Sequence, residues 1–298
     1  MNKIRFIFFF LLLSPFFSLL NADYRYSLVL CAIFKNEAPF FKEWIEYHKM
    51  LGVEHFRLYN NGSTDNSLEV LDPYIRNGDV TIVNWPSNHK VRNYSFVFAT
   101  QWPAIRDALV HYTGVAKWLA IIDTDEFIVP LQHSNIPSFL NEYEDYGGVV
   151  INWQCFGTSW LPDLRQNMLQ TETLLLKAPE TSEWNHQVKS IVRPERVALQ
   201  ITKTIPHAWI YHDPYYGVAP NLQVHHFGLV DVSKIQINHY VHRSEKYFYE
   251  NKIERKAYQE GRKWSTEFLE DWHRSCNQVE DTKIFRFLPA LKERLGAG

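Results

Sequence analysis

The first half of the chain alternates between short apolar runs and amphipathic segments, and this alternation limits the folds open to it. The apolar runs cover residues 26–34, 54–60, 80–85 and 117–123, and segments with helical spacing of apolar side chains cover 38–51, 67–75 and 95–112. Strands separated by helices pair in parallel, with helices on both faces of the sheet. The pattern therefore predicts an α/β fold with a Rossmann-like, mostly parallel sheet flanked by helices.

Polar residues follow three of these predicted strands directly. They are "KNE" (35–37), "NNGSTD" (60–65) and "DTDEF" (123–127). In an open parallel sheet, ligands bind beyond the carboxyl ends of the strands. We therefore expect these three segments to share one edge of the sheet and to form the ligand site.

The segment "DTDEF" places Asp123, Asp125 and Glu126 immediately after a buried strand. Buried charge is costly unless it is paired or bound to a metal. Carboxylate oxygens are the ligands that hard divalent cations prefer, and such a cation can hold the phosphates of a nucleotide. The alternative is a solvated strand end, in which Asp123 or Asp125 caps the following turn.

Composition and net charge limit the classes of binding partner that the chain can have. The net charge of −2 over 298 residues gives no basic footprint, so we expect no nucleic-acid partner. Aromatic residues make up 15% of the chain, which suits either a sugar-binding cleft or a large core. Cys155 and Cys276 either pair in an oxidising compartment or remain free, because their spacing does not decide it.

Residues 1–22 have the composition of a targeting segment. Lys3 and Arg5 precede an apolar stretch from Phe6 to Leu20, and Ala22 offers a cleavage position. This pattern predicts a signal peptide or a type II anchor, with a secretory or membrane-associated location and membrane association through this segment. A catalytic domain over 23–265 and a helical C-terminal extension over 266–298 are expected to follow.

Three blocks together resemble glycosyltransferase family 92 over about residues 26–260. They are "CAIFKNEAPFFKEWIEYHKMLGVEHFRLYNNGSTDNS", "WLAIIDTDEFIVP" and "INHYVHRSEKYF", in the family's order and rough spacing. The resemblance implies a GT-A fold and a nucleotide-sugar donor that is usually UDP-linked. It also implies a glycan acceptor and a divalent metal, commonly manganese, with magnesium as the alternative.

The resemblance also assigns roles to individual residues. Asp123 and Asp125 match the D-x-D motif that holds the metal, with Asp123 also on the donor, and His239 matches a histidine that completes the metal shell. Arg243 and Ser244 stand where the family has a Lys-Ser pair near the diphosphate, and arginine keeps the charge while adding a bidentate fork. The expected donor-side residues on the first two turns are Asn36, Glu37, Asn60 and Asp65. Asn60 departs from the family, which often has an aspartate there.

Glycosyl transfer needs a neutralised diphosphate, a base and a wall for the sugar. Lys189 is a further candidate for the diphosphate, and the candidates for the wall are Trp153, Phe156 and Trp160. For an inverting enzyme we favour Glu183 as the base, with Glu180, Asp163 and Asp213 as alternatives. The predicted function is metal-dependent transfer of a galactose-like hexose to a hydroxyl acceptor, with inversion.

Two other functions remain open from the sequence. One is a phosphatase-like hydrolase with Asp123 as its nucleophile, and the other is a catalytically silent sugar-binding protein on the same fold. A zinc hydrolase would need His207, His212, His225 and His239, which lack the spacing typical of zinc ligands. His48 lies on an apolar helical face and is expected to pack in the core.

Overall fold

The structure, a computed structural model, describes residues 23–86, 100–165, 168–199, 209–224, 228–250, 258–259, 262–263 and 265–296. The predicted targeting segment 1–22 lies outside these residues, as do His207, His225 and His226. Within the described residues, no helix combines the length and the apolar character that a membrane crossing requires.

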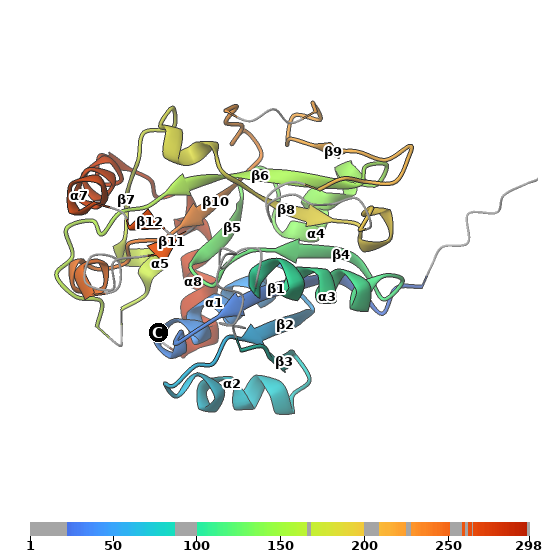
Figure 1. The fold of residues 1–298 in the computed structure, drawn as a ribbon, viewed down its shortest axis with the longest axis horizontal. Coiled ribbons are helices and arrows are strands. Elements are labelled where there is room, and N and C mark those ends of the chain that lie inside the picture. Colours follow the sequence, from blue (N-terminus) through green and yellow to red (C-terminus); the bar gives the residue numbers. More distant parts are fainter. Residues whose placement is uncertain are drawn as a thin grey trace, which may run out of the picture.

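A nine-stranded mixed sheet forms the centre of the molecule (Figure 1). Its order is β3-β2-β1-β4-β8-β6-β10-β5, and β9 pairs with β6. The first four strands in chain order are parallel: β1 (Tyr26–Phe34), β2 (His55–Asn60), β3 (Val80–Asn84) and β4 (Ala116–Ile121). The remaining strands are β5 (Glu126–Pro130), β6 (Gly148–Cys155), β8 (Val188–Val192), β9 (Gly217–Val218) and β10 (Ile235–His239). Strand β8 runs antiparallel between β4 and β6, and β5 runs antiparallel to β10.

Eight α-helices lie among the described residues. They are α1 (Ala38–Met50), α2 (Ser67–Arg76), α3 (Trp102–Tyr112), α4 (Ile136–Leu140), α5 (Gln170–Thr173), α6 (Glu245–Phe248), α7 (Thr266–Ser275) and α8 (Leu288–Leu295). The 3-10 helices are η2 (Asn141–Tyr143), η3 (Glu183–His186), η4 (Pro194–Arg196) and η6 (Lys283–Phe287). Two further antiparallel pairs of short strands lie outside the main sheet: β7 (Leu176–Lys177) with β13 (Val279–Glu280), and β11 (Tyr258–Gln259) with β12 (Arg262–Lys263).

Strand β1 shows how the sheet is buried on both faces. Leu28, Leu30 and Ala32 belong to the core cluster that contains α1, whereas Val29 and Cys31 belong to the cluster that contains α3. Successive side chains of a strand point to opposite faces, so a continuous apolar run is what a sheet covered twice requires. The predicted sheet with helices on both faces is confirmed.

The C-terminal segment packs against α1. Ile284 and Leu291 are fully buried in the same cluster as the α1 side chains, and α8 lies beside α1 (Figure 1). Arg294 Nε donates to Glu46 Oε2 at 3.0 Å, and Lys42 Nζ donates to the Leu295 carbonyl at 3.1 Å. The predicted helical tail is therefore present, interrupted by η6, and shares the main core.

His48 is a core histidine, as expected. Its Nδ1 lies 2.8 Å from the Trp44 carbonyl, and its Nε2 accepts from the Ile128 backbone N–H at 3.3 Å. Complete burial lowers its pKa to about 3, because the charged imidazolium would lose its hydration there. The neutral ring thus joins α1 to β5.

Strands β5 and β10 were not anticipated from the sequence. Strand β10 ends at His239, and its pairing with β6 on one side and β5 on the other buries all five of its residues. The "EFIVP" run of β5 is likewise fully buried.

Candidate active site

Glu126 closes the turn between β4 and β5. Its Oε2 accepts from the backbone N–H of Asp123 at 2.8 Å, and its own N–H donates to the Asp123 carbonyl at 3.2 Å. The Trp44 indole donates to the Glu126 carbonyl at 2.8 Å and ties the turn to α1. The side chain of Glu126 is fully buried, so the third acid of the motif holds the turn together.

Lys189 of β8 provides the positive charge beneath this turn. Its buried ammonium contacts Asp123 Oδ2 directly and lies 3.5 Å from Glu126 Oε1, which makes no hydrogen bond of its own. Burial raises the pKa of Glu126, Lys189 opposes that rise and Asp123 adds to it. Burial would also lower the pKa of Lys189, but the Asp123 and Glu126 carboxylates raise it above the ordinary lysine value. The lysine thus stays charged among carboxylates that would otherwise repel one another.

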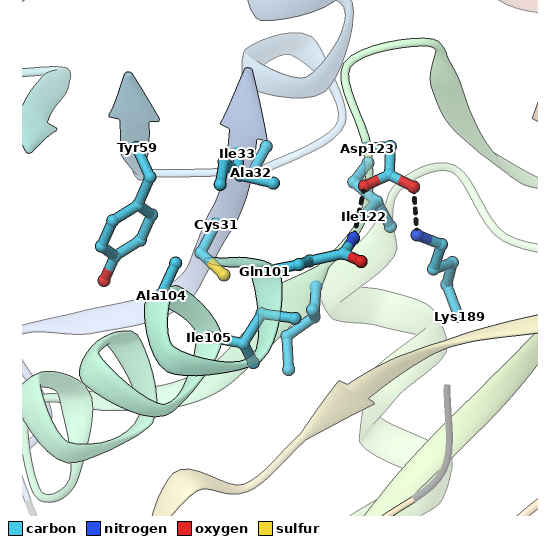
Figure 2. A pocket seen from close by; sticks show the side chains of 11 residues that line it. Cys31, Ala32, Ile33, Tyr59, Gln101, Ala104, Ile105, Ile122, Asp123 and Lys189 are labelled. Atoms are coloured by element: carbon cyan, nitrogen blue, oxygen red, sulfur yellow. Dashed lines mark hydrogen bonds and ion pairs between the residues drawn. The ribbon is translucent and has the colours of Figure 1, made fainter. Parts of the chain in front are cut away.

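Asp123 points toward a cavity at the carboxyl ends of β1 and β4. Figure 2 shows its carboxylate between Gln101 Nε2, which donates to Oδ1 at 3.2 Å, and Lys189. Cys31 and Tyr59 line the same cavity, whose volume is about 10 Å³. That is the space of about one water molecule.

Asp125 faces a different partner. Its Oδ1 lies 3.5 Å from His239 Nε2 at the end of β10, and the Tyr240 backbone N–H donates to its carbonyl at 2.8 Å. The Trp153 ring packs on His239 with 4.2 Å between the ring centroids. The turn therefore sends its two aspartates in separate directions, Asp123 toward Lys189 and Asp125 toward His239.

Of the three predicted metal ligands, Asp125 and His239 lie close enough together to share a divalent cation, whereas Asp123 contacts Lys189 and Gln101. No group of three or more His, Cys, Asp or Glu side chains able to hold a metal lies among the described residues. Asp125 and His239 alone supply one carboxylate and one imidazole at a separation that a single ion can bridge. Mg²⁺ and similar cations often take only one or two protein ligands and fill their shell with water and substrate phosphates. The predicted ligands Asp125 and His239 come together, and Asp123 does not join them.

Arg243 is the least satisfied cation near the site. Its guanidinium pairs with Glu37 through Nη2 and lies over the Phe40 ring, 3.4 Å from the centroid. The side chain is only 1% exposed, yet Nε and Nη1 have no hydrogen-bond partner. Burial opposes its charge, but Glu37 raises the pKa above the ordinary arginine value. Buried donors without acceptors are costly, which makes Arg243 a candidate to donate to an anion.

The first two rim segments are joined by their own side chains. Asn36 Oδ1 accepts from the Thr64 N–H at 2.7 Å, and Asp65 Oδ2 accepts from the Ala38 N–H at 3.0 Å, at the start of α1. Asn60 Oδ1 accepts from the Ser63 N–H at 2.8 Å. Asn36 and Asp65 therefore hold the first two predicted rim segments side by side, whereas Asn60 stabilises the turn within the second segment. Asn36 adopts a left-handed conformation, with φ at 60°.

The remaining predicted residues fall into two groups. Ser244 is buried and caps α6, accepting from the Tyr247 N–H at 3.3 Å. Glu183, the favoured base, is exposed at the start of η3, and its alternatives Glu180, Asp163 and Asp213 are exposed as well. Asn185 fixes the Glu183 loop to β6, because its Oδ1 accepts from the Cys155 N–H at 2.9 Å.

Two expectations about aromatic and cysteine residues are also resolved. Phe156 is fully buried against Tyr240 and cannot form a sugar wall, whereas Trp160 is exposed.

Cys155 and Cys276 meet in one buried cluster, both as free thiols, although 120 residues of chain separate them.

Sequence reasoning missed Gln101, which holds Asp123, and Glu43, which accepts from the Gln170 and Thr171 N–H groups at 3.0 Å. No motif marks Gln101. A carboxylate on the apolar face of α1 was a signal available for Glu43, because a buried acid needs partners.

The family's sequence profile, described as glycosyltransferase family 92, matches residues 26–281 of this chain. The chain belongs to glycosyltransferase family 92. Its fold is accordingly of the GT-A type, as predicted, with a curled mixed sheet in place of a uniformly parallel one.

Relatives of this family 92 chain include plant and nematode proteins. It is 29% identical to "Glycosyltransferase family 92 protein RCOM_0530710" of Ricinus communis, over 61% of this chain and 31% of the relative. It is 32% identical to "Galactan beta-1,4-galactosyltransferase GALS2" of Arabidopsis thaliana, over 43% and 25% respectively. For "Beta-1,4-galactosyltransferase galt-1" of Caenorhabditis elegans the identity is 25%, over 61% and 40%. The aligned part therefore spans well under half the length of each of these relatives.

Solved structures give weaker similarities. S. aureus TarS matches with a TM-score of 0.33 and 13% identity, over 56% of this chain and 47% of that one. Mannosyltransferase PcManGT from Pyrobaculum calidifontis, solved with GDP-Man and Mn²⁺, matches with a TM-score of 0.31 and 15% identity, over 58% and 46%. At these scores the structures identify no residue of the family 92 chain by correspondence.

The first prediction concerns Lys189. We expect Lys189→Met to lower the free energy of unfolding by about 3 kcal/mol, because it leaves buried Glu126 and Asp123 without their cation. Urea unfolding measures the loss. The matched control is Lys292→Met, whose partner Glu172 is exposed, and it should cost less than about 1 kcal/mol. Equal losses in the two variants would show that the cluster under the turn does not depend on Lys189.

Proposed function

We propose that the chain is a metal-dependent hexosyltransferase that moves a galactose-like sugar from a UDP-linked donor to a hydroxyl of a glycan, with inversion. The observation on which this rests most is the placement of buried Arg243, with two unsatisfied donors, near the Asp125–His239 pair. Arginine binds phosphate oxygens in a bidentate fashion. The names of the galactosyltransferase relatives support the choice of sugar.

Asp125 and His239 would hold the divalent cation, for which manganese is our first choice and magnesium the second. When bound, the ion would neutralise charge on the leaving diphosphate. Arg243 would donate to the diphosphate oxygens from its free Nε and Nη1. Asp123, fixed between Gln101 and Lys189, would present its carboxylate to the nucleoside side of the donor. Asn36, Glu37, Asn60, Asp65 and Ser244 would support this donor site from the rim.

Glu183 is the proposed base. Inversion requires a carboxylate that takes the proton of the acceptor hydroxyl as the oxygen attacks the anomeric carbon from the face opposite the diphosphate. An exposed carboxylate on a loop that Asn185 fixes to β6 is accessible to an incoming acceptor. The hydrolase alternative would need a free Asp123 nucleophile, and both Asp123 oxygens are already engaged by Gln101 and Lys189.

We also propose that residues 1–22 target the chain to the secretory pathway or to a membrane. Lys3 and Arg5 followed by a long apolar stretch support this.

The second prediction concerns turnover. The wild-type chain should release UDP from UDP-galactose in the presence of Mn²⁺ and transfer galactose to β-1,4-linked galacto-oligosaccharides, measured by mass spectrometry. Asp125→Asn should reduce manganese-dependent turnover at least about 100-fold, because it removes a charge that binds the diphosphate-neutralising cation. Asp72→Asn, an exposed acid on α2, is the control and should match the wild type. Full activity in Asp125→Asn, or no turnover of any UDP-sugar by the wild type, would overturn the proposal.

The third prediction concerns the base. Glu183→Gln should lower kcat for transfer about 100-fold while UDP binding stays unchanged, because the amide cannot accept the proton. Glu180→Gln, three residues earlier on the same loop, tests the alternative. Transfer lost only in Glu180→Gln would move the assignment to Glu180, and the anomeric configuration of the product, read by NMR, tests inversion.

A further inference from the structure

Trp160 is the most exposed tryptophan among the residues described, at 54% of its surface. It lies in the loop that follows β6, between Phe156 and Leu161. Single exposed apolar residues are common and by themselves indicate nothing. What distinguishes Trp160 is the backbone that presents it.

Ser159 and Trp160 both adopt the left-handed conformation, with φ at 52° and 59°. This conformation costs non-glycine residues roughly 1–2 kcal/mol each, and it persists only where surrounding contacts impose it. Asn277 Oδ1 accepts from the Ser159 N–H at 2.7 Å, and Ser159 Oγ accepts from the Leu175 and Leu176 N–H groups at 2.7 and 2.8 Å. Gly157 permits this arrangement, because a Cβ there would lie 2.4 Å from the Asn277 amide.

The indole of Trp160 also packs against His273. His273 of α7 meets the Trp160 ring edge-on, with 5.2 Å between centroids. His273 Nε2 lies 2.8 Å from Glu245 Oε1 and 3.1 Å from Thr158 Oγ1, so the supporting ring is itself fixed. The chain therefore holds a large apolar face toward water in one orientation.

The loop lies beside the segment that carries the proposed donor residues. The Phe156 N–H donates to the His239 carbonyl at 2.9 Å, and the Glu245 N–H donates to the Leu161 carbonyl at 2.9 Å. These two bonds join both ends of the loop to 239–245, which includes His239 and Arg243. Trp160 thus lies in a loop whose two ends are joined to the segment of the proposed donor residues.

Polar groups accompany the indole. Asp163 and Lys246, both more than half exposed, lie 3.5 Å apart, and Lys246 is joined to the loop through its N–H and the Pro162 carbonyl at 3.0 Å. A flat apolar ring, with a carboxylate three residues further along the same loop and an ammonium paired with that carboxylate, matches a pyranose, which has an apolar C–H face and hydroxyls at its rim.

We propose that Trp160 is the stacking platform for a pyranose ring of the acceptor glycan, with Asp163 and Lys246 receiving its hydroxyls. The inference rests on the proposed function and specifies how that function selects its acceptor. Holding the acceptor is the role of this platform, while binding and activating the donor belong to the residues around Asp125 and Arg243.

The fourth prediction tests this with UDP-galactose, Mn²⁺ and β-1,4-galactotetraose. Trp160→Ala should raise KM for galactotetraose roughly 10- to 100-fold, the range expected for losing one stacked ring. Its kcat and its rate of UDP-galactose hydrolysis without acceptor should stay within about threefold of the wild type. Trp160→Leu should behave like Trp160→Ala, whereas Trp160→Phe should retain most of the affinity. Phe285→Ala, another exposed aromatic on η6, is the matched control.

The outcomes separate the two proposals. If the wild type transfers galactose and Trp160→Ala keeps its KM, the platform is wrong and the proposed function stands. If Trp160→Ala and Trp160→Leu lose donor hydrolysis together with transfer, Trp160 serves the donor side and the inference is also overturned. If the wild type neither hydrolyses nor transfers, the proposed function fails and the platform fails with it.

Discussion

The buried ion cluster of Lys189, Asp123 and Glu126 is the interaction on which the candidate site depends. Glu126 closes the turn after β4 through the Asp123 N–H, and Lys189 from the neighbouring antiparallel strand lies between the two acids and partly offsets their charge. Without that cation, adjacent carboxylates at the end of a buried strand would repel one another and lose hydration. With Lys189 in place, Asp123 and Glu126 are held at the turn, and Asp125 faces His239 on the other side.

A second buried pairing of a cation with a carboxylate, Arg243 with Glu37, lies at the first rim segment. Glu37 holds Arg243 through one nitrogen and leaves two others without acceptors, so the guanidinium is fixed in place before any ligand arrives. Fixed donors are what an anionic leaving group needs, since they require no reorganisation when charge develops. Under the proposed function, Asn36 and Asp65 would serve this end indirectly, because they hold the first two rim segments together.

The sequence allowed the parallel half of the fold to be predicted, because the first four strands are largely apolar runs separated by helical segments. The sequence could not distinguish the roles of Asp123, Asp125 and Glu126, because all three are acidic residues within four positions of one another. Their roles differ because Lys189 and His239 approach the turn from different strands, and such pairings join residues more than 60 positions apart. Phe156 and Trp153 illustrate the same limit: both are aromatic residues near the end of β6, but one packs on Tyr240 and the other on His239.

The central claim is that Asp125 and His239 hold a cation that shares its coordination with a nucleoside diphosphate. Isothermal titration of the full chain with UDP, with Mn²⁺ and with EDTA in its place, tests this directly. The account predicts that Mn²⁺ tightens UDP binding at least about tenfold and that UDP tightens Mn²⁺ binding by the same factor, because coupling between two sites is reciprocal. Asp125→Asn should abolish the coupling. Equal affinity for UDP in Mn²⁺ and in EDTA would contradict the claim.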